Sequence, residues 1–332
     1  MKKSIIALLV AVMVSISSIG FVGCTKDPDT IRINEVTHSV FYAPLYLAMS
    51  LGYFEEEGIK IDLAAAEGSN TSMATLLSNN CDIALAGPET VVYVAAGQST
   101  DIPVVFGQLT KRDGAFLVSK TPIENFNWST HLRNKTVIAG RAGGLPAMTF
   151  EWVVNSLGMY RDNGITLDTE TSFAMQVPTF EATDAEFCTM FEPTASEFVA
   201  AGKGHIVASI GEQSGEIPYT CFIAKKGYLS SNSEKIKGFL RAIKKAYTFI
   251  QTNEASVVAE KLQSSFPSSS LTSLEYAITS YKNIDAWMST PAMTQSSYNR
   301  LIEVLKNAGT LDSNASIPFS TVVDNTYAHA VA

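Results

Sequence analysis

The chain has 332 residues, of which 46% are hydrophobic, and this is enough for two lobes of ordinary domain size, each with a buried core. Its formal net charge is −8 at pH 7, and no basic cluster interrupts the sequence. An acidic chain of this kind is a poor candidate for binding nucleic acid or an anionic lipid surface, so we expect no nucleic-acid partner.

The first 23 residues predict a signal peptide. A basic start, Met1–Lys3, precedes an apolar run, Ile5–Val14, that is too short to span a bilayer comfortably, and small residues follow. Cys24 stands directly after Gly23, which resembles a bacterial lipoprotein cleavage site, where the cysteine becomes the first mature residue and carries the lipid. Residues 24–30 would then form a polar tether. An uncleaved membrane anchor is the alternative, and either arrangement places the bulk of the chain outside the membrane.

Apart from Cys24, the chain holds Cys81, Cys188 and Cys221, an odd number for an exported protein. None of them forms a Cys-x-x-Cys spacing that would bind a metal. We expect mostly free, partly buried thiols, and a single bridge between Cys188 and Cys221 stays open as an alternative.

Strands and helices alternate over the first hundred mature residues, which argues for an α/β fold with a mainly parallel sheet. The expected strands cover residues 31–36, 59–63, 81–86 and 102–109. Helices are expected to begin near Pro44, after Ser69–Thr71 and after Pro88.

The stretch Thr37–Ala48 follows the first strand and is predicted to be a loop that opens a helix. Pro44 suits the first turn of a helix, where its missing N–H would be unpaired in any case. Gly52 stands where a left-handed helix end is expected. Because loops at the carboxyl ends of strands bind small ligands in open α/β sheets, we interpret this stretch as the first wall of a ligand pocket. A buried aromatic plug is the equal alternative.

A second unit is expected to begin where the strand Ala115–Ser119 leaves the first sheet. Its further strands are predicted at residues 136–139, 164–167, 187–190 and 206–208. A glycine-rich turn, Gly140–Pro146, should precede a helix over residues 147–157, and Pro193 should open another.

The chain is then expected to return to the first unit. We interpret Gly211–Pro218 as a polar loop and Tyr219–Ala224 as a strand that crosses back. Helices are predicted from Glu234 onward and over residues 255–266, 271–287 and 295–308. This organisation assigns residues 31–114 and 220–332 to lobe 1, and residues 115–219 to lobe 2.

Several short motifs together resemble one family of bacterial proteins. They are Ala43–Ala48, Gly52–Gly58, Cys81–Ala84, Leu132–Val137 and Phe191–Ala195. These stretches are similar to those of ABC-transporter substrate-binding lipoproteins, in the group of aliphatic-sulfonate, taurine and nitrate binders and the aminopyrimidine-binding relatives of the yeast thiamine-pyrimidine enzyme. Asn134 replaces a glycine that is common in this group, and asparagine tolerates a left-handed backbone.

The resemblance implies a two-lobed periplasmic-binding-protein type II fold, in which two crossing strands form the hinge. It also implies a small-molecule ligand bound in the cleft and delivery to an ABC permease with a cytoplasmic ATPase. We expect a monomer that is lipid-anchored at the outer face of the cell membrane and carries no cofactor and no metal.

Four loops are expected to converge on the cleft, each at the carboxyl end of a strand. Each of their candidate ligand residues also has a structural explanation, such as a helix cap, a buried ring or a surface charge. The first three loops contribute His38, Phe41, Tyr42, Ser69, Asn70, Gly87, Glu89 and Thr90. The fourth contributes Arg141, Gly143 and Gly144 from the glycine-rich turn, while Glu192 and Tyr219 join from the following strands.

Two of these residues decide the expected ligand. A cleft that holds both Glu89 and Glu192 would leave two desolvated carboxylates unmatched by an anion, at a cost of several kcal/mol. We therefore expect a neutral or cationic flat heterocycle, with an aminopyrimidine-like compound as the best guess. An anion of the sulfonate, taurine or nitrate type is the alternative.

Two other function classes compete with a binding module. A pyrimidine-synthesising enzyme would need clustered reactive groups, but the histidines, residues 38, 131, 205 and 329, are dispersed and no G-x-S-x-G elbow is present. A metal carrier would need ligands at metal-binding spacing, which the sequence lacks. We therefore predict a protein that is not an enzyme.

Overall fold

The computed structural model describes residues 27–331. The predicted signal peptide, the lipidation site at Cys24 and the first residues of the predicted tether lie outside these described residues. The chain divides into a unit that ends at Thr30 and a main unit, Ile31–Ala332. Within the described residues, no helix combines the length and the apolar character needed to cross a bilayer.

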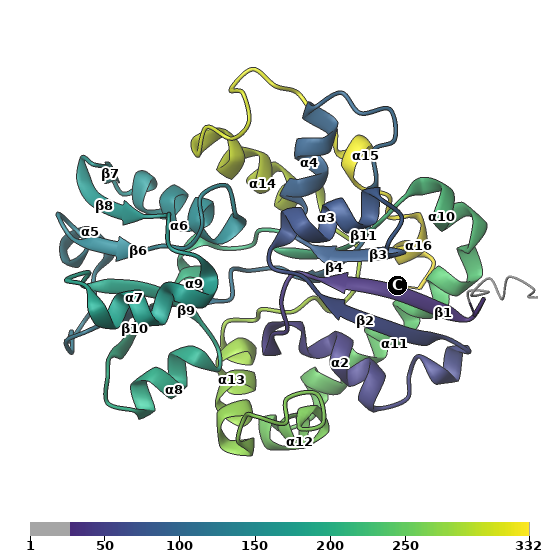
Figure 1. Ribbon diagram of the computed structural model, residues 1–332, viewed down its shortest axis with the longest axis horizontal. Coiled ribbons are helices and arrows are strands. Elements are labelled where there is room, and N and C mark those ends of the chain that lie inside the picture. The colour runs from purple at the N-terminus through teal and green to yellow at the C-terminus, as the bar shows by residue number, and fades with distance from the viewer. Residues whose placement is uncertain (1–26, 332) are drawn as a thin grey trace, which may run out of the picture. The chain divides into compact units, whose positions relative to one another are not determined.

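Two sheets form the main unit, and Figure 1 shows them next to each other with helices around both. The first has the strand order β2-β1-β3-β11-β4 and the second has the order β10-β5-β9-β6-β8-β7. The strands of the first sheet are β1 (Thr30–Glu35), β2 (Lys60–Ala65), β3 (Ile83–Ala86), β4 (Val104–Thr110) and β11 (Thr220–Ala224). Those of the second are β5 (Ala115–Ser119), β6 (Thr136–Ile138), β7 (Tyr160–Arg161), β8 (Gly164–Asp168), β9 (Phe187–Phe191) and β10 (His205–Ser209).

The helices follow the alternation expected from the sequence through the two sheets, and a helical segment closes the chain. Before β11 the helices are α2 (Ala43–Ser50), α3 (Ser69–Leu77), α4 (Glu89–Ala96), α5 (Trp128–His131), α6 (Leu145–Ser156), α7 (Gln176–Ala182), α8 (Thr194–Ala200) and α9 (Ile210–Ser214). After β11 they are α10 (Lys226–Ser231), α11 (Ser233–Thr252), α12 (Ala255–Leu262), α13 (Leu271–Asn283), α14 (Gln295–Asn307), α15 (Phe319–Val322) and α16 (Thr326–His329). Short 3-10 turns are η1 (Val40–Tyr42), η2 (Glu55–Glu57) and η3 (Phe173–Met175).

The α/β fold class is confirmed, but both sheets are mixed, and the sequence led us to expect mainly parallel ones. Strand β1 pairs with β3, and β6 pairs with β8 and β9, in parallel. Strand β11 runs antiparallel to β3 and β4, and β5 runs antiparallel to β9 and β10. The chain leaves the first sheet at Thr110 and re-enters it at Thr220, directly opposite. Because β11 begins beside the residue at which β4 ends, the two strands must be antiparallel.

The two segments that cross between the sheets lie side by side, as predicted. The N–H of Ile217 donates to the carbonyl of Lys111 at 3.0 Å, and the N–H of Tyr219 donates to the carbonyl of Thr110 at 3.2 Å. The N–H of Thr220 also donates to Thr110 Oγ1 at 2.9 Å. These contacts form the two-stranded connection that the resemblance implied.

Local backbone predictions were confirmed at two turns and wrong at a third. Gly52, with φ of +73°, and Asn134, with φ of +58°, adopt the left-handed conformation expected of them. The segment predicted as a polar loop after β10 instead begins with α9, whose first turn is capped by Ser209 Oγ at 3.2 Å from the N–H of Glu212. A Cβ at Gly211 would lie 2.2 Å from the carbonyl oxygen of Asp113, so this glycine permits close packing.

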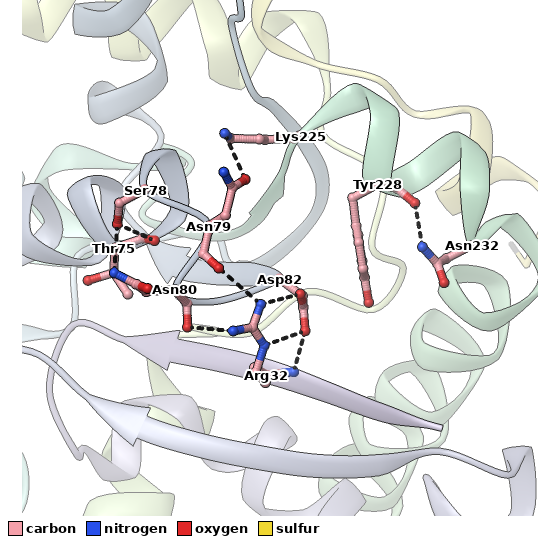
Figure 2. A network of polar contacts seen from close by, with 9 residues as sticks. All are labelled: Arg32, Thr75, Ser78, Asn79, Asn80, Asp82, Lys225, Tyr228 and Asn232. Atoms are coloured by element: carbon pink, nitrogen blue, oxygen red, sulfur yellow. Dashed lines mark hydrogen bonds and ion pairs between the residues drawn. The ribbon is translucent and has the colours of Figure 1, made fainter. Parts of the chain in front are cut away.

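The amino-terminal ends of β1 and β3 are joined by a polar network that Figure 2 shows. Arg32 donates to both oxygens of Asp82, from Nε at 3.0 Å and from Nη2 at 2.7 Å, and also to the carbonyls of Asn79 and Asn80. Lys225 Nζ, just beyond β11, donates to Asn79 Oδ1 at 3.0 Å. The polar side chains at this end of the first sheet therefore bond to one another and to the backbone, and they stabilise the fold.

The three described cysteines are all free and buried. Cys188 belongs to the second sheet, and Cys221 belongs to the first. The expectation of free thiols is confirmed, and the alternative Cys188–Cys221 bridge is not formed.

Candidate ligand-binding site

A cavity of about 370 Å³ lies where loops of the two sheets meet. Loops that follow β1, β2 and β3 line it from the first sheet, and loops that follow β6 and β8 line it from the second. Strand β9 and the start of β11 complete the lining. The four loops predicted from the sequence therefore meet, at the carboxyl ends of strands as expected.

Most of the predicted ligand residues line this cavity. They are Phe41, Tyr42, Ser69, Asn70, Gly87, Glu89, Arg141, Gly143, Gly144 and Tyr219. His38, Thr90 and Glu192 are not among the lining residues, although each lies next to one that is. Their hydrogen bonds explain where these three side chains point.

His38 turns away from the cavity toward the segment that follows α12 and the buried carboxyl group of Glu35. Its Nδ1 lies 3.0 Å from Glu35 Oε1, and its Nε2 lies 2.8 Å from the carbonyl of Ser265. Its ring also contacts Tyr46 and Phe266, with centroid distances of 4.8 and 4.5 Å, and these two rings lie 5.1 Å from each other. Both ring nitrogens therefore have protein partners, and the half-exposed ring also packs on an aromatic pair.

Thr90 and Glu192 also bond within the protein. Thr90 Oγ1 donates to the carbonyl of Gly87 at 2.7 Å. Glu192, which is 2% exposed, accepts from the N–H of Ser196 at 2.9 Å, from Ser196 Oγ at 2.7 Å and from Ser280 Oγ at 3.0 Å. Of the expected pair, Glu89 lines the cavity and Glu192 does not, while Glu67, an exposed residue that the sequence interpretation did not name, is a second lining carboxylate.

One wall of the cavity is aromatic. The ring of Phe41 lies 5.7 Å from that of Phe191 and 5.8 Å from that of Tyr219, and Phe173 lies 5.7 Å from Phe191 on its other side. Trp287 Nε1 donates to the carbonyl of Phe41 at 2.9 Å and fixes the backbone of the first loop. These rings meet edge to face and give this part of the cavity an apolar aromatic lining that suits a ring-bearing ligand.

The structure reconciles the two interpretations of the first loop. Phe41 and Tyr42 are 1% and 5% exposed, so they belong to the buried core, and both line the cavity as well. The α2 helix begins at Ala43 with Pro44 in its first turn, which places the two rings directly before the helix. The side chains of Phe41 and Tyr42 are therefore both buried rings and part of the cavity wall.

Glu89, the first residue of α4, brings a polar group to the same cavity. Its carboxyl group folds back over Gly87, where an added Cβ would lie 1.9 Å from Oε2 and 2.5 Å from Oε1. Gly87 has no left-handed φ, so a glycine is needed here for space alone. The N–H of Gly87 donates to Ser69 Oγ at 3.3 Å, which ties this turn to the start of α3.

Burial dominates the electrostatics of Glu89. Loss of hydration raises its pKa to about 7, while the Ser69 hydroxyl and the charge of Arg141 act in the opposite direction. Asp113, in the first crossing segment, is the other buried carboxyl whose pKa rises to about 7 through burial. Asp113 does not line the cavity.

Arg141 comes from the glycine-rich turn of the second sheet and reaches the first. An added Cβ at Gly68 would lie 3.4 Å from its Nη2. The residue is exposed, so its charge stands at the rim, whereas Glu89 is buried. The cavity therefore has the buried carboxyl group of Glu89 and, among its exposed lining residues, the guanidinium group of Arg141 and the carboxylate of Glu67.

The sequence interpretation missed the loop after β8. Ser172, Phe173, Ala174 and Gln176 line the cavity from there. The strand itself was predicted, and the rule used for the other loops applies equally to its carboxyl end. The rule was therefore sufficient to find this loop, and Phe173 is the residue whose omission matters most because it extends the aromatic wall.

The fold and the cavity define a class: α/β proteins with two mixed sheets whose loops enclose a small-molecule site. The sequence model of the NMT1/THI5-like family matches residues 40–255. The chain is 37% identical over 301 residues to YtlA of Bacillus subtilis (strain 168), which carries the name of a binding protein, and the match covers 91% of this chain and 89% of YtlA. The chain belongs to the NMT1/THI5-like family.

Two further comparisons mark the range of this similarity. The 4-amino-5-hydroxymethyl-2-methylpyrimidine phosphate synthase of Aspergillus parasiticus is 25% identical over 235 residues, which is 66% of each chain. The periplasmic aliphatic sulphonate binding protein SsuA from Escherichia coli superimposes with a TM-score of 0.69 at 14% identity, and the match covers 90% of this chain and 99% of SsuA. The second likeness shows a shared fold.

Proposed function

We propose that this protein is the extracytoplasmic substrate-binding component of an ABC importer. The observation that carries the proposal is the cavity itself, which is built from loops of both sheets in a fold shared with SsuA. Its volume of about 370 Å³ is within the range of small-molecule sites, about 300–1,000 Å³. The name of YtlA, which is similar over most of its length, supports a binding role.

In this proposal, lobe 1 comprises residues 31–114 and 220–332, and lobe 2 comprises residues 115–219. The paired segments at Thr110 and Tyr219 serve as the hinge, and ligand binding favours the closed arrangement that the permease recognises. Contacts between the proposed lobes include the Tyr93 hydroxyl, which donates to the carbonyl of Gly143 at 3.4 Å. Such contacts lie next to the cavity, where a ligand would add to them.

The proposed ligand is a flat heterocycle, neutral or cationic, with an aminopyrimidine-like compound as the best candidate. The aromatic wall supports a flat ligand, and Glu89 supports N–H donors on its edge. Arg141 and the glycine-rich turn favour the second candidate, an anion of the sulfonate type. Burial of Glu89 weighs against that anion, because an ionised carboxyl at depth would repel it.

A binding role is proposed in preference to catalysis. The similarity to a pyrimidine phosphate synthase raises the alternative, but His38 is held by Glu35 and Ser265, and the described cysteines are buried. Burial raises the pKa of the Cys81 thiol to about 11, and a thiol is a poor nucleophile in that state. The proposal further includes lipidation at Cys24, a monomeric state, and a permease with its cytoplasmic ATPase as partners.

Calorimetry of the purified protein with 4-aminopyrimidine and with ethanesulfonate tests the proposal. We expect saturable binding of the heterocycle and none of the sulfonate. Tight binding of ethanesulfonate alone would reverse the ligand class. An incubation in which the bound molecule is converted to product, or in which His38 is consumed, would overturn the binding role.

A further inference from the structure

We propose that Glu89 selects the charge of the ligand by pairing with a cationic, N–H-bearing edge of an aromatic ring. The inference rests on the proposed binding function and narrows the ligand to an aromatic organic cation, such as an aminopyridinium or a protonated aminopyrimidine. It also makes Glu89 the residue that distinguishes such a cation from a neutral ring of the same shape.

The first observation is an unpartnered oxygen. Glu89 is 1% exposed, and its Oε2 has no hydrogen-bond partner among the residues that the structure describes. The carboxyl group occupies the space that the missing side chain of Gly87 leaves. Oε2 has almost no exposed surface and lies over Gly87. A buried carboxyl oxygen without a donor is costly, so a ligand N–H group toward which the carboxyl turns gains from satisfying it.

The second observation is the set of groups that surround this carboxyl. Tyr42, Tyr93, Tyr219 and Cys221 all interact with the charge of Glu89, and burial together with that charge raises the pKa of each, so all four are uncharged at neutral pH. Arg141, at the exposed rim, is the one permanently charged residue that acts on Glu89. The carboxylate therefore lacks a buried cation, and the ligand is placed to supply it.

The third observation is the aromatic wall formed by Phe41, Phe191 and Tyr219, which lines the same cavity as Glu89. Aromatic ring faces attract cations, and the effect is strongest where water is excluded. A positively charged ring thus gains from two groups that line the cavity, from contact with the aromatic side chains and from an N–H edge on the carboxylate. An anion gains from neither.

The pairing makes binding depend on pH with a defined sign. Glu89 has a pKa of about 7 in the free protein, so it is mostly protonated at pH 6 and mostly ionised at pH 8. A cation binds the ionised form, so its affinity rises by about tenfold from pH 6 to pH 8 and binding near pH 7 releases protons. A neutral ring that uses Glu89 as either acceptor or donor shows a much smaller change.

The test uses probes whose own charge does not change over this range. These are 1-methyl-4-aminopyridinium as a fixed cation, 4-aminobenzamide as a neutral ring with an amino edge, and pyridine-3-sulfonate as an anion. Titration calorimetry of the full mature chain at pH 6, 7 and 8, in buffers of different ionisation enthalpy, measures both the affinity and the protons released.

We expect the cation to bind more tightly than the neutral ring at pH 8, with the tenfold pH dependence. Glu89→Gln removes the charge at constant shape, so it should weaken cation binding by about 10- to 100-fold at pH 8 and abolish the pH dependence. Glu89→Asp, which keeps the charge, should retain a pH dependence of the same sign. Asp113→Asn is the matched control, because this carboxyl also has a raised pKa but lies outside the cavity, and it should keep the full dependence.

The outcomes separate this inference from the proposed function. Equal binding of the cation and the neutral ring, or a pH dependence that survives in Glu89→Gln and disappears in Asp113→Asn, overturns charge selection but leaves a binding protein. Preference for the anion also overturns charge selection. If no probe binds at millimolar concentration, both charge selection and a flat-ring ligand are wrong.

Discussion

Burial of the Glu89 carboxyl group lowers the stability of the folded protein when the group is ionised and no ligand is bound. Its pKa is about 7 in the folded protein, above the ordinary value of 4.5, so the folded state holds this proton at pH values where the unfolded chain has lost it. Stability therefore falls as pH rises from about 4.5 to 7 and stays reduced above that range. A residue that binds ligand by charge thus weakens the empty protein, which is common where function requires a buried ionisable group.

The cost of this burial can be measured directly with Glu89→Gln. At pH 8 the variant should be more stable than the natural chain by up to about 3 kcal/mol, and at pH 4.5 the two should be equal. Urea unfolding at both pH values measures the difference. Glu197→Gln, on the exposed face of α8, is the control and should change nothing. A variant that is no more stable at pH 8 would show that Glu89 is not desolvated.

Glu192 has the opposite character, because its hydrogen bonds make it a structural acceptor. Glu192→Ala should lower the free energy of unfolding by about 1–3 kcal/mol, since it leaves the Ser196 N–H and the hydroxyls of Ser196 and Ser280 without their acceptor. Ligand affinity should stay within a fewfold of the natural value because the side chain lies outside the cavity. Loss of ligand binding without loss of stability would show that Glu192 binds ligand, as the sequence suggested.

At the scale of single elements, the turn between β3 and α4 positions the carboxyl of Glu89. In Gly87→Ala the new methyl group would lie 1.9 Å from Oε2, so the carboxyl must move while the backbone keeps an allowed conformation. We expect Gly87→Ala to weaken binding of the cationic probe nearly as much as Glu89→Gln. The double variant should be no weaker than either single one, because both changes remove the same contact. Additive losses in calorimetry would contradict this coupling.

Much of the element order could be predicted from the sequence because local patterns and packing agree. The apolar face of α11, including Ile236, Phe239 and Ile243, is buried as its spacing predicts. Strand β5 coincides with its predicted range, Ala115–Ser119. In these segments the spacing of apolar residues alone predicts the element and its buried face, and tertiary contacts do not change either.

The remaining features depend on contacts that a single sequence does not reveal. Gly211 indicated a loop, but it serves close packing against Asp113, and a helix forms around it. The position of Glu192 after a strand predicted a cleft carboxylate, yet Ser280, distant in the chain, helps to hold it elsewhere. The types of residue found at the carboxyl ends of strands were thus enough to locate the cavity. The direction in which each side chain points depends on partners that are distant in the sequence.

At the scale of the whole molecule, the proposed hinge predicts a change of distance between the lobes. Spin labels at Leu77→Cys on α3 and Tyr160→Cys on β7 are placed at partly exposed positions, 37% and 53% exposed, on the two sides of the hinge. The distance distribution should narrow and shift to one population when ligand binds. Labels at Leu77→Cys and Tyr276→Cys, both in proposed lobe 1, should keep their distance. A ligand that alters neither distribution would contradict closure.

The central claim is that the cavity between the two sheets captures one small molecule. Native mass spectrometry of the protein purified without denaturation from its own host tests this most directly, with Ala174→Trp as a variant that fills the cavity from an exposed position in η3. We predict one bound small molecule of aromatic heterocycle composition on the natural chain, and its loss in the variant. Two results would contradict the account. The natural chain carries no small molecule and binds none of the cationic, neutral and anionic ring probes, or both proteins retain the same molecule equally.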